Sequence, residues 1–196
     1  LASGGPVSRV RESAAGGAHD RGLPALRRTP CREWFEGGDR VPPIDPDRRV
    51  VRYPDLYTNY ILVERGKAAV RALEALGVEV VVPSVPGAGR APLSQGMIDT
   101  ARRKAERVAE TLGPYVEDGY DVVVVEPSDL AMFRGDYERL LPEESSEPLA
   151  EHSYEVLEYV YGLLANGADT DGLDLADGDG ETVAYHGHCN QKSLNK

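Results

Sequence analysis

Two valine-rich runs, which begin at Val78 and Asp121, constrain this chain more than any other feature. Each is too short for a typical helix, and it is apolar at almost every position. Such strands are typical of a sheet that is covered on both faces, as parallel sheets are. Shorter runs of similar character occur near Val50 and Thr182. The pattern predicts one parallel sheet with strands near residues 50–53, 78–82, 121–126 and 182–185.

Stretches with helical periodicity separate these runs. In the longest of them Ser94 is the expected N-cap, and Gly113-Pro114 marks the expected end. Strand–helix alternation of this kind predicts an α/β fold, a parallel sheet with flanking helices joined by right-handed crossovers. The helices are expected at residues 66–76, 94–112, 130–141 and 148–165.

Composition excludes some classes of function. The 196 residues carry 33 Asp and Glu against 22 Lys and Arg, so the formal net charge is −11. A surplus of this size disfavours nucleic-acid binding, which depends on neutralising phosphates. Only four of the basic residues are Lys, and an acidic, lysine-poor surface fits a halophile's high-salt cytoplasm. An ordinary acidic protein from a GC-rich genome is the alternative.

The two ends of the chain differ in character. Residues 1–48 are rich in Gly, Pro and Arg without sustained periodicity, which predicts a linker or the tail of a preceding helical unit. Residues 49–196 are expected to form the α/β domain. The two cysteines, Cys31 and Cys189, cannot build a disulfide framework and favour a reducing compartment. No apolar stretch is long enough to span a bilayer.

Four polar or glycine-rich loops follow the expected strands. They are Asp55–Tyr60, Pro86–Arg90, Glu126–Asp129 and Tyr185–Cys189. Ligands of open α/β sheets bind beyond the carboxyl ends of the strands, so these loops are the expected location of a functional site.

The same loops resemble the cysteine-rich CCG domain. The resemblance rests on Tyr57-Thr58-Asn59-Tyr60 with Gly66-Lys67-Ala68-Ala69-Val70, on Gly89-Arg90-Ala91-Pro92-Leu93, on Glu126-Pro127-Ser128 and on Tyr185-His186-Gly187-His188-Cys189. This domain occurs in the iron–sulfur subunits of anaerobic glycerol-3-phosphate dehydrogenase, glycolate oxidase and D-lactate dehydrogenases, and in heterodisulfide reductase. The resemblance covers residues 49–196 and implies a Rossmann-like half of a tandem module. Less specifically, residues 1–48 resemble the connection to an upstream ferredoxin-like domain.

By this resemblance the cysteines of the first half would fall at Leu56, Gly87, Ala88 and Asp129, and none of these is a cysteine. Iron–sulfur clusters need thiolate ligands, so the first-half cluster site is degenerate. Cys189 matches the first cysteine of the second half, whose remaining cysteines would lie beyond Lys196. The chain is thus expected to hold one metal ligand of an incomplete 4Fe-4S site.

Other interpretations of these residues compete with the resemblance. His186, His188 and Cys189 could form a zinc site, although no spaced partner accompanies them. The loop before Arg90 resembles a phosphate-binding turn but lacks the full fingerprint, so we expect Arg90 to be a structural or surface arginine. Asp129 could be catalytic, and the better prediction is that it caps a helix starting at Leu130.

The resemblance implies a function for the complete protein. It would be an iron–sulfur, FAD-linked oxidoreductase that passes electrons from D-lactate, glycolate or glycerol 3-phosphate to a quinone-type acceptor. The flavin would lie in an upstream domain or a partner subunit, the implied partners being a flavin-containing dehydrogenase and a ferredoxin-like iron–sulfur domain. This segment alone would not be catalytic. The alternative is a degenerate docking module without a cluster. Location would be cytoplasmic, with a peripheral position at the inner membrane face left open.

Overall fold

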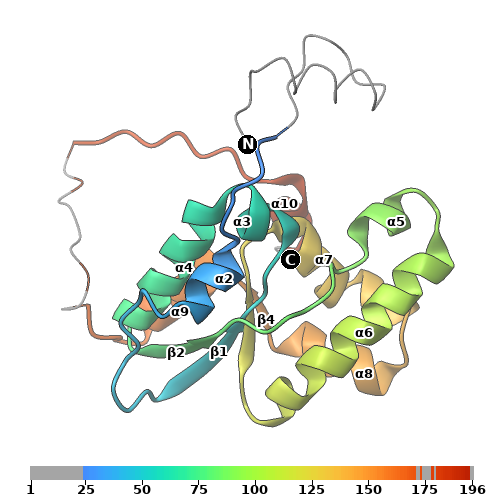
Figure 1. Cartoon of the computed structure of the whole chain (residues 1–196), viewed down its shortest axis with the longest axis horizontal. Coiled ribbons are helices and arrows are strands. Elements are labelled where there is room, and N and C mark those ends of the chain that lie inside the picture. The colour runs from blue at the N-terminus through green and yellow to red at the C-terminus, as the bar shows by residue number, and fades with distance from the viewer. Residues whose placement is uncertain (1–23, 171–172, 174–177, 179, 195–196) are drawn as a thin grey trace.

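A four-stranded parallel sheet organises the protein, and the computed structural model describes it over residues 24–170, 173, 178 and 180–194. The strand order is β2-β1-β3-β4. The chain therefore adds β2 on one side of β1 and then crosses to add β3 and β4 on the other (Figure 1). This is the doubly wound arrangement, with its switch point between β1 and β3. The strands are β1 Arg48–Arg52, β2 Val78–Val81, β3 Asp121–Val124 and β4 Ser153–Glu155.

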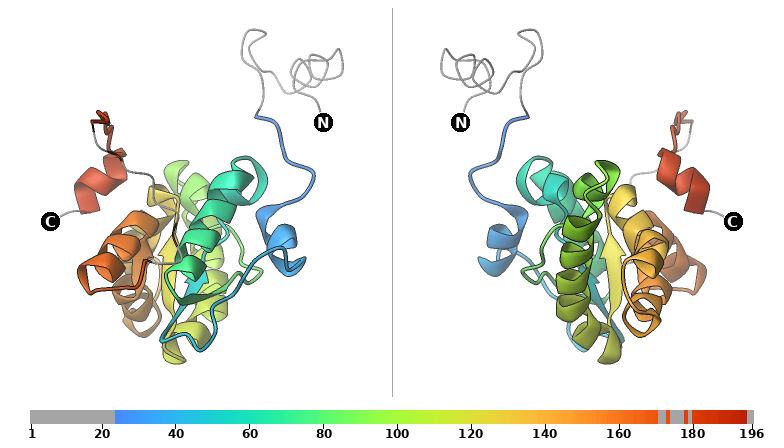
Figure 2. Two further views of the ribbon diagram at one scale, coloured as in Figure 1. Left: turned by 90° about the vertical axis from the view of Figure 1, so that its left-hand side faces the viewer. Right: turned by 90° about the vertical axis from the view of Figure 1, so that its right-hand side faces the viewer.

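Helices cover both faces of the sheet, as Figure 2 shows. One core cluster joins the sheet to α2, α4 and α9, and the other joins it to α6, α7 and α8. Val50 belongs to the first cluster and Val51 to the second, because successive strand residues face opposite sides. The helices are α2 Cys31–Glu36, α3 Leu56–Tyr60, α4 Val63–Ala75, α5 Arg90–Ser94, α6 Ile98–Glu117, α7 Pro127–Arg134, α8 Glu143–Glu151, α9 Val156–Ala165 and α10 Cys189–Leu194, with a 3-10 turn η1 at Asp136–Arg139.

The structure confirms the α/β fold with a parallel sheet and three of the four predicted strands. The strand predicted at 182–185 is wrong. These residues form no regular structure, and Val183 and Tyr185 are 82% and 73% exposed. The fourth strand is instead β4, which pairs with β3 along Val122–Val124.

Strand β4 interrupts the helix that was predicted over 148–165. Ser153 is fully buried beside β3, so tertiary pairing overrides the local helical periodicity there. The chain then restarts as α9, because the Glu155 carboxylate accepts from the backbone N–H of Glu158 while the Glu158 carboxylate accepts from that of Glu155. This capping box is a strong start signal for a helix.

Helix α6 begins later and ends later than predicted. Ser94 is the last residue of the short helix α5. Gly96 has a φ of +74°, so the helical conformation is interrupted before α6 begins at Ile98. At the other end α6 continues through Pro114 to Glu117. Val116, which is 8% exposed, packs in the core and keeps this last turn in place.

Part of the expected linker is packed against the domain. In α2, Cys31 is fully buried and Trp34 is 8% exposed, and both belong to a core cluster with α4. Arg40 forms an ion pair with the buried carboxylate of Glu74 in α4. The packed part of the domain thus begins at Cys31, and residues 1–23 lie outside the described part of the chain.

Candidate functional site

The carboxyl ends of β1, β2 and β3 bring three of the four loops to one edge of the sheet. Leu56 begins α3 after β1, Gly87 and Ala88 lie in the segment after β2, and Asp129 lies in the first turn of α7 after β3. Leu56 is 62% exposed, whereas Ala88 is 2% exposed. Leu56 therefore faces solvent, whereas Ala88 is packed in the core.

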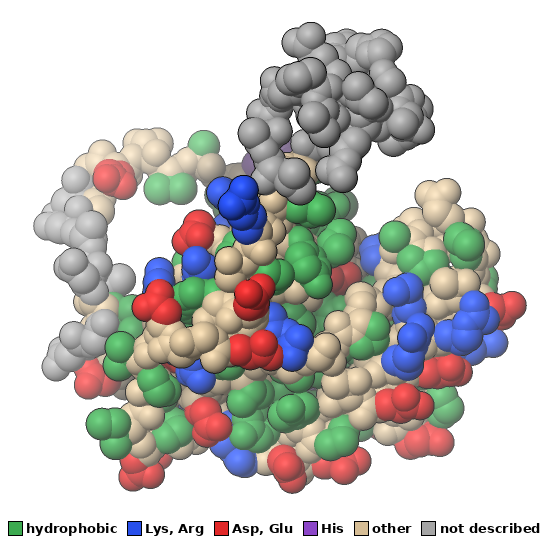
Figure 3. All heavy atoms as spheres, in the orientation of Figure 1, with side chains coloured by type: hydrophobic (Ala, Val, Ile, Leu, Met, Phe, Trp, Pro, Cys, Tyr) green, Lys and Arg blue, Asp and Glu red, His purple; other side chains and the backbone are tan. Residues whose placement is uncertain are grey.

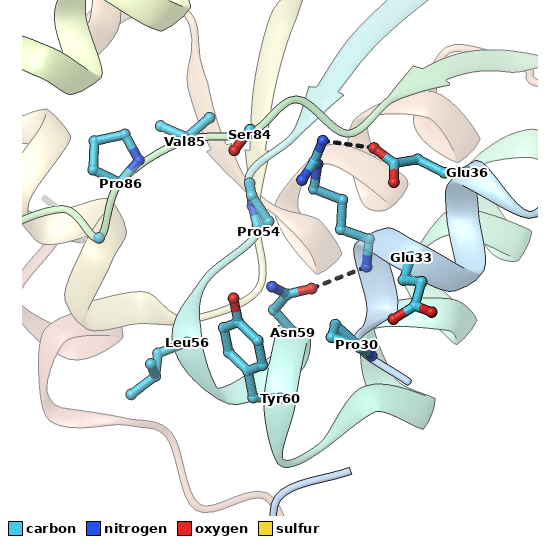
Figure 4. Close-up of a pocket in the computed structure, with 12 residues that line it drawn as sticks. Pro30, Glu33, Glu36, Pro54, Leu56, Asn59, Tyr60, Ser84, Val85 and Pro86 are labelled. Atoms are coloured by element: carbon cyan, nitrogen blue, oxygen red, sulfur yellow. Dashed lines mark hydrogen bonds and ion pairs between the residues drawn. The ribbon is translucent and has the colours of Figure 1, made fainter. Parts of the chain in front are cut away.

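A pocket of about 550 Å³ opens at this edge between α2, α3 and the segment after β2 (Figure 4). Leu56 and Gly87 line it, whereas Ala88 and Asp129 do not. Its volume is within the range of small-ligand sites. The lining residues are Pro30, Arg32, Glu33, Glu36, Pro54, Leu56, Asn59, Tyr60, Ser84, Val85, Pro86 and Gly87.

A buried arginine contacts the residues of the loop and helix that follow β1. Arg52 is 0% exposed, and its Nη2 lies 3.6 Å from Oδ2 of Asp55 and contacts the Thr58 hydroxyl. Asp55 also caps α3, because its Oδ1 accepts from the backbone N–H of Thr58 at 2.9 Å. Burial lowers the pKa of Arg52, and Cys31 and Asp55 oppose this shift.

Space for this arginine depends on Gly66 in α4. A Cβ at Gly66 would lie 2.8 Å from both Nη2 of Arg52 and Sγ of Cys31, and 2.9 Å from the carbonyl oxygen of Thr58. Sequence reasoning did not identify Arg52 or Cys31 as packing partners. The only local signal was an arginine at the end of a buried strand, three residues before an aspartate that caps a helix.

Asp129 does not cap α7, so that prediction is wrong. The helix begins at Pro127, and its cap is Glu126, whose carboxylate accepts from the backbone N–H of Ser128 at 3.2 Å. Asp129 is instead half-buried at the carboxyl edge. Its pKa is raised to about 7, mainly by burial and also by the negative charges of Asp55 and Glu126, while Arg90 opposes the shift.

Two buried tyrosines fix the segment after β2. The hydroxyl of Tyr53 donates to the carbonyl oxygen of Pro86 and that of Tyr137 to the carbonyl oxygen of Ala88, each at 2.9 Å. Phe133 packs edge-on against the ring of Tyr53, with 5.1 Å between centroids. Burial raises the pKa of both tyrosines, so they are neutral donors at physiological pH. Sequence reasoning missed this pair, which no local motif signals.

The glycine and arginine that follow are structural. Gly89 has a φ of +97°, and a Cβ there would lie 3.2 Å from the carbonyl oxygen of Ala101 in α6. Arg90 forms a 2.6 Å ion pair with Asp136 across the edge. Both residues therefore hold α5 against its neighbours, in line with the structural role expected for Arg90.

Cys189 lies at the start of α10, which contacts α7, and its thiol is exposed. It does not follow a strand, contrary to the expectation from sequence. Sγ lies 3.9 Å from Nδ1 of His188, and that nitrogen accepts from the backbone N–H of Asn190 at 3.2 Å. His186 is also exposed. Within the described residues, no three His, Cys, Asp or Glu side chains come together as metal ligands.

The residues at this edge do not fit an iron–sulfur cluster by themselves. Leu56, Gly87 and Ala88 have no ligand atom in their side chains, and Asp129 supplies only a hard carboxylate oxygen. Cys31 is enclosed in the core, where burial raises the pKa of its thiol. Cys189 is left as the one exposed thiol in the described chain.

Comparisons with known proteins assign no relative to this chain, because no family model, no curated protein and no solved structure matches it. Within the described residues, no helix has both the length and the apolar character required to cross a membrane.

Proposed function

We propose that this chain is the α/β scaffold of an iron–sulfur, flavin-linked oxidoreductase of the D-lactate, glycolate or glycerol 3-phosphate type. In this proposal a flavin-containing dehydrogenase domain or subunit oxidises the substrate. Electrons pass through a ferredoxin-like domain and a 4Fe-4S cluster to a quinone-type acceptor. The chain supplies Cys189 as one thiolate, and the other ligands come from outside the described residues.

The observation that carries the proposal is the placement of Cys189. Its thiol is exposed, and α10 contacts α7, whose first turn lies at the carboxyl edge of the sheet. Cys31, by contrast, is fully buried. A ligand to a metal that is completed by another segment must be accessible, and of the two cysteines only Cys189 meets this condition.

The alternative is a docking module that holds no cluster at all. The absence of side-chain ligands at Leu56, Gly87 and Ala88 favours this alternative. A peripheral position at the inner face of the cell membrane is compatible with both versions, since a quinone-type acceptor would reside there.

The test uses the tagged chain purified anaerobically from its host with its natural partners. Flavin, iron and acid-labile sulfide are measured, and dye reduction is assayed with D-lactate, glycolate and glycerol 3-phosphate. The proposal predicts flavin and iron in the complex and dye reduction with one of these substrates.

Two matched variants separate the proposal from its alternative. Cys189→Ser replaces the exposed thiolate with a harder and far less acidic oxygen, and we expect iron content and dye reduction to fall. Cys31→Ser makes the same exchange in the core and should leave both unchanged in the folded complex. Full iron content and turnover in Cys189→Ser would refute a role as ligand and favour the docking module.

A further inference from the structure

Among the described residues, the pocket lined by Leu56 and Gly87 contains one buried polar side chain with an unpaired hydrogen-bond donor. Asn59 is 6% exposed, and its Oδ1 accepts from the backbone N–H of Arg32 at 2.9 Å. This bond fixes the orientation of the amide. Nδ2 then faces the pocket (Figure 4), and no described residue accepts a hydrogen bond from it. A fixed donor without a partner points to a ligand with a carbonyl oxygen.

The opposite wall offers unpaired backbone. The segment after β2 runs without helix or ladder, and the N–H groups and carbonyl oxygens of Ser84, Val85 and Gly87 form no hydrogen bond with any described residue. Unpaired main-chain groups outside helix and sheet can bond to the backbone of an extended peptide, and main-chain hydrogen bonds supply much of the affinity in such complexes.

Charged residues of α2 at the edge of the pocket favour one type of side chain in such a peptide. Arg32 is already paired with Glu36 at 2.6 Å, whereas the exposed carboxylate of Glu33 has no basic partner in the described chain. The pocket thus carries a net negative charge, and the whole chain carries −11. In Figure 3, Lys and Arg side chains lie over α6 and also around α2, and among the residues that line the pocket the only basic one is the paired Arg32. A cationic ligand is therefore favoured.

Apolar residues complete the surface. Leu56 is 62% exposed and Tyr60 is 41% exposed, and both line the pocket together with Val85 and Pro86. An aliphatic side chain next to the cationic one would cover them and remove their surface from water.

We propose that this pocket binds a short extended peptide segment of a partner protein that carries a Lys or Arg next to an aliphatic residue. The peptide backbone bonds to Nδ2 of Asn59 and to the free backbone groups of Ser84, Val85 and Gly87. The cationic side chain pairs with Glu33, and the aliphatic one packs on Leu56. The site is independent of Cys189 and of any cluster.

The test follows backbone amide shifts of the full chain by NMR during titration with acetyl-Ala-Val-Arg-Leu-Ala-amide. Three matched peptides carry citrulline or Glu in place of Arg, or N-methyl groups on alternate peptide nitrogens. We expect saturable shifts at Asn59, Ser84, Val85 and Gly87, weaker binding in the order Arg, citrulline, Glu, and no binding of the N-methylated peptide. Absence of saturable shifts, equal affinity for Arg and Glu, or equal affinity of the N-methylated peptide overturns the proposal.

Protein variants test the two named contacts. Glu33→Gln should weaken the Arg peptide about threefold, as expected for an exposed ion pair, and leave the citrulline peptide unchanged. Asn59→Asp keeps the acceptor for Arg32 but replaces the donor, and should weaken the uncharged citrulline peptide about fivefold. Glu110→Gln on the exposed side of α6 is the control and should change neither affinity. Unchanged affinities in the first two variants also overturn the proposal, and Glu33→Gln changes an exposed residue outside the core.

Discussion

Asp129 makes the stability of this protein depend on pH in a way that one substitution should remove. Its pKa is raised to about 7 from a usual value of 3.8, first by burial and then by Asp55 and Glu126. The folded state therefore binds this proton more tightly than the unfolded state. The stabilising contribution is fully present below the unfolded pKa and is lost as pH rises through 7.

The magnitude follows from the size of the shift. Each pKa unit corresponds to about 1.4 kcal/mol, so ionising Asp129 between pH 5 and pH 8.5 costs at most about 3 kcal/mol of unfolding free energy. Asp129 is only half-buried, and solvent around the ionised carboxylate reduces this to about 2 kcal/mol. Asn at this position is neutral throughout and has nearly the same shape. The unfolding free energy of Asp129→Asn should therefore gain about 2 kcal/mol on that of the wild type between pH 5 and pH 8.5.

The assay is urea unfolding at a series of pH values and constant ionic strength, with the wild type and Asp129→Asn measured side by side. Titration of all other groups is common to both proteins and cancels in the difference. Glu110→Gln removes one negative charge from an exposed site on α6 and should follow the wild type. If the curves of the wild type and Asp129→Asn stay parallel from pH 5 to 8.5, the environment deduced for Asp129 is wrong.

Three further outcomes are expected. Gly66→Ala should destabilise the fold by about 2 kcal/mol in urea unfolding, because its Cβ would overlap three buried atoms. The control Gly162→Ala in α9, whose Cβ would meet nothing within 4 Å, should be neutral or stabilise by about 0.5–1 kcal/mol. Equal effects of the two substitutions would contradict the packing described for α4. Tyr137→Phe should cost about 1–2 kcal/mol, since it leaves the buried carbonyl of Ala88 without a donor, and a cost near zero would mean that this bond is not made. Reconstituted anaerobically with iron and sulfide, the chain alone should bind no stable cluster, and a visible charge-transfer band with stoichiometric iron would show the opposite.

Local sequence was sufficient for three of the four strands and for the fold class. Val78 and Val122 stand in runs that are apolar on both faces, and such runs are stable only inside a covered parallel sheet. The positions of Leu56, Gly87, Ala88 and Asp129 after strands could also be predicted, because each loop directly follows such a run.

Only the tertiary structure decided which segment completes the sheet and how the edge residues are used. Ser153 lies in a strand because it pairs with β3 on the side away from β1. This pairing is a tertiary interaction, and the helical periodicity of the sequence around Ser153 does not indicate it. The amide of Asn59 is oriented by a hydrogen bond from Arg32, 27 positions earlier in the chain. The hydroxyl of Tyr137 donates to the carbonyl oxygen of Ala88, 49 positions earlier. Hydrogen bonds and burial of this range depend on how the helices pack, and a one-dimensional pattern carries no information about that packing.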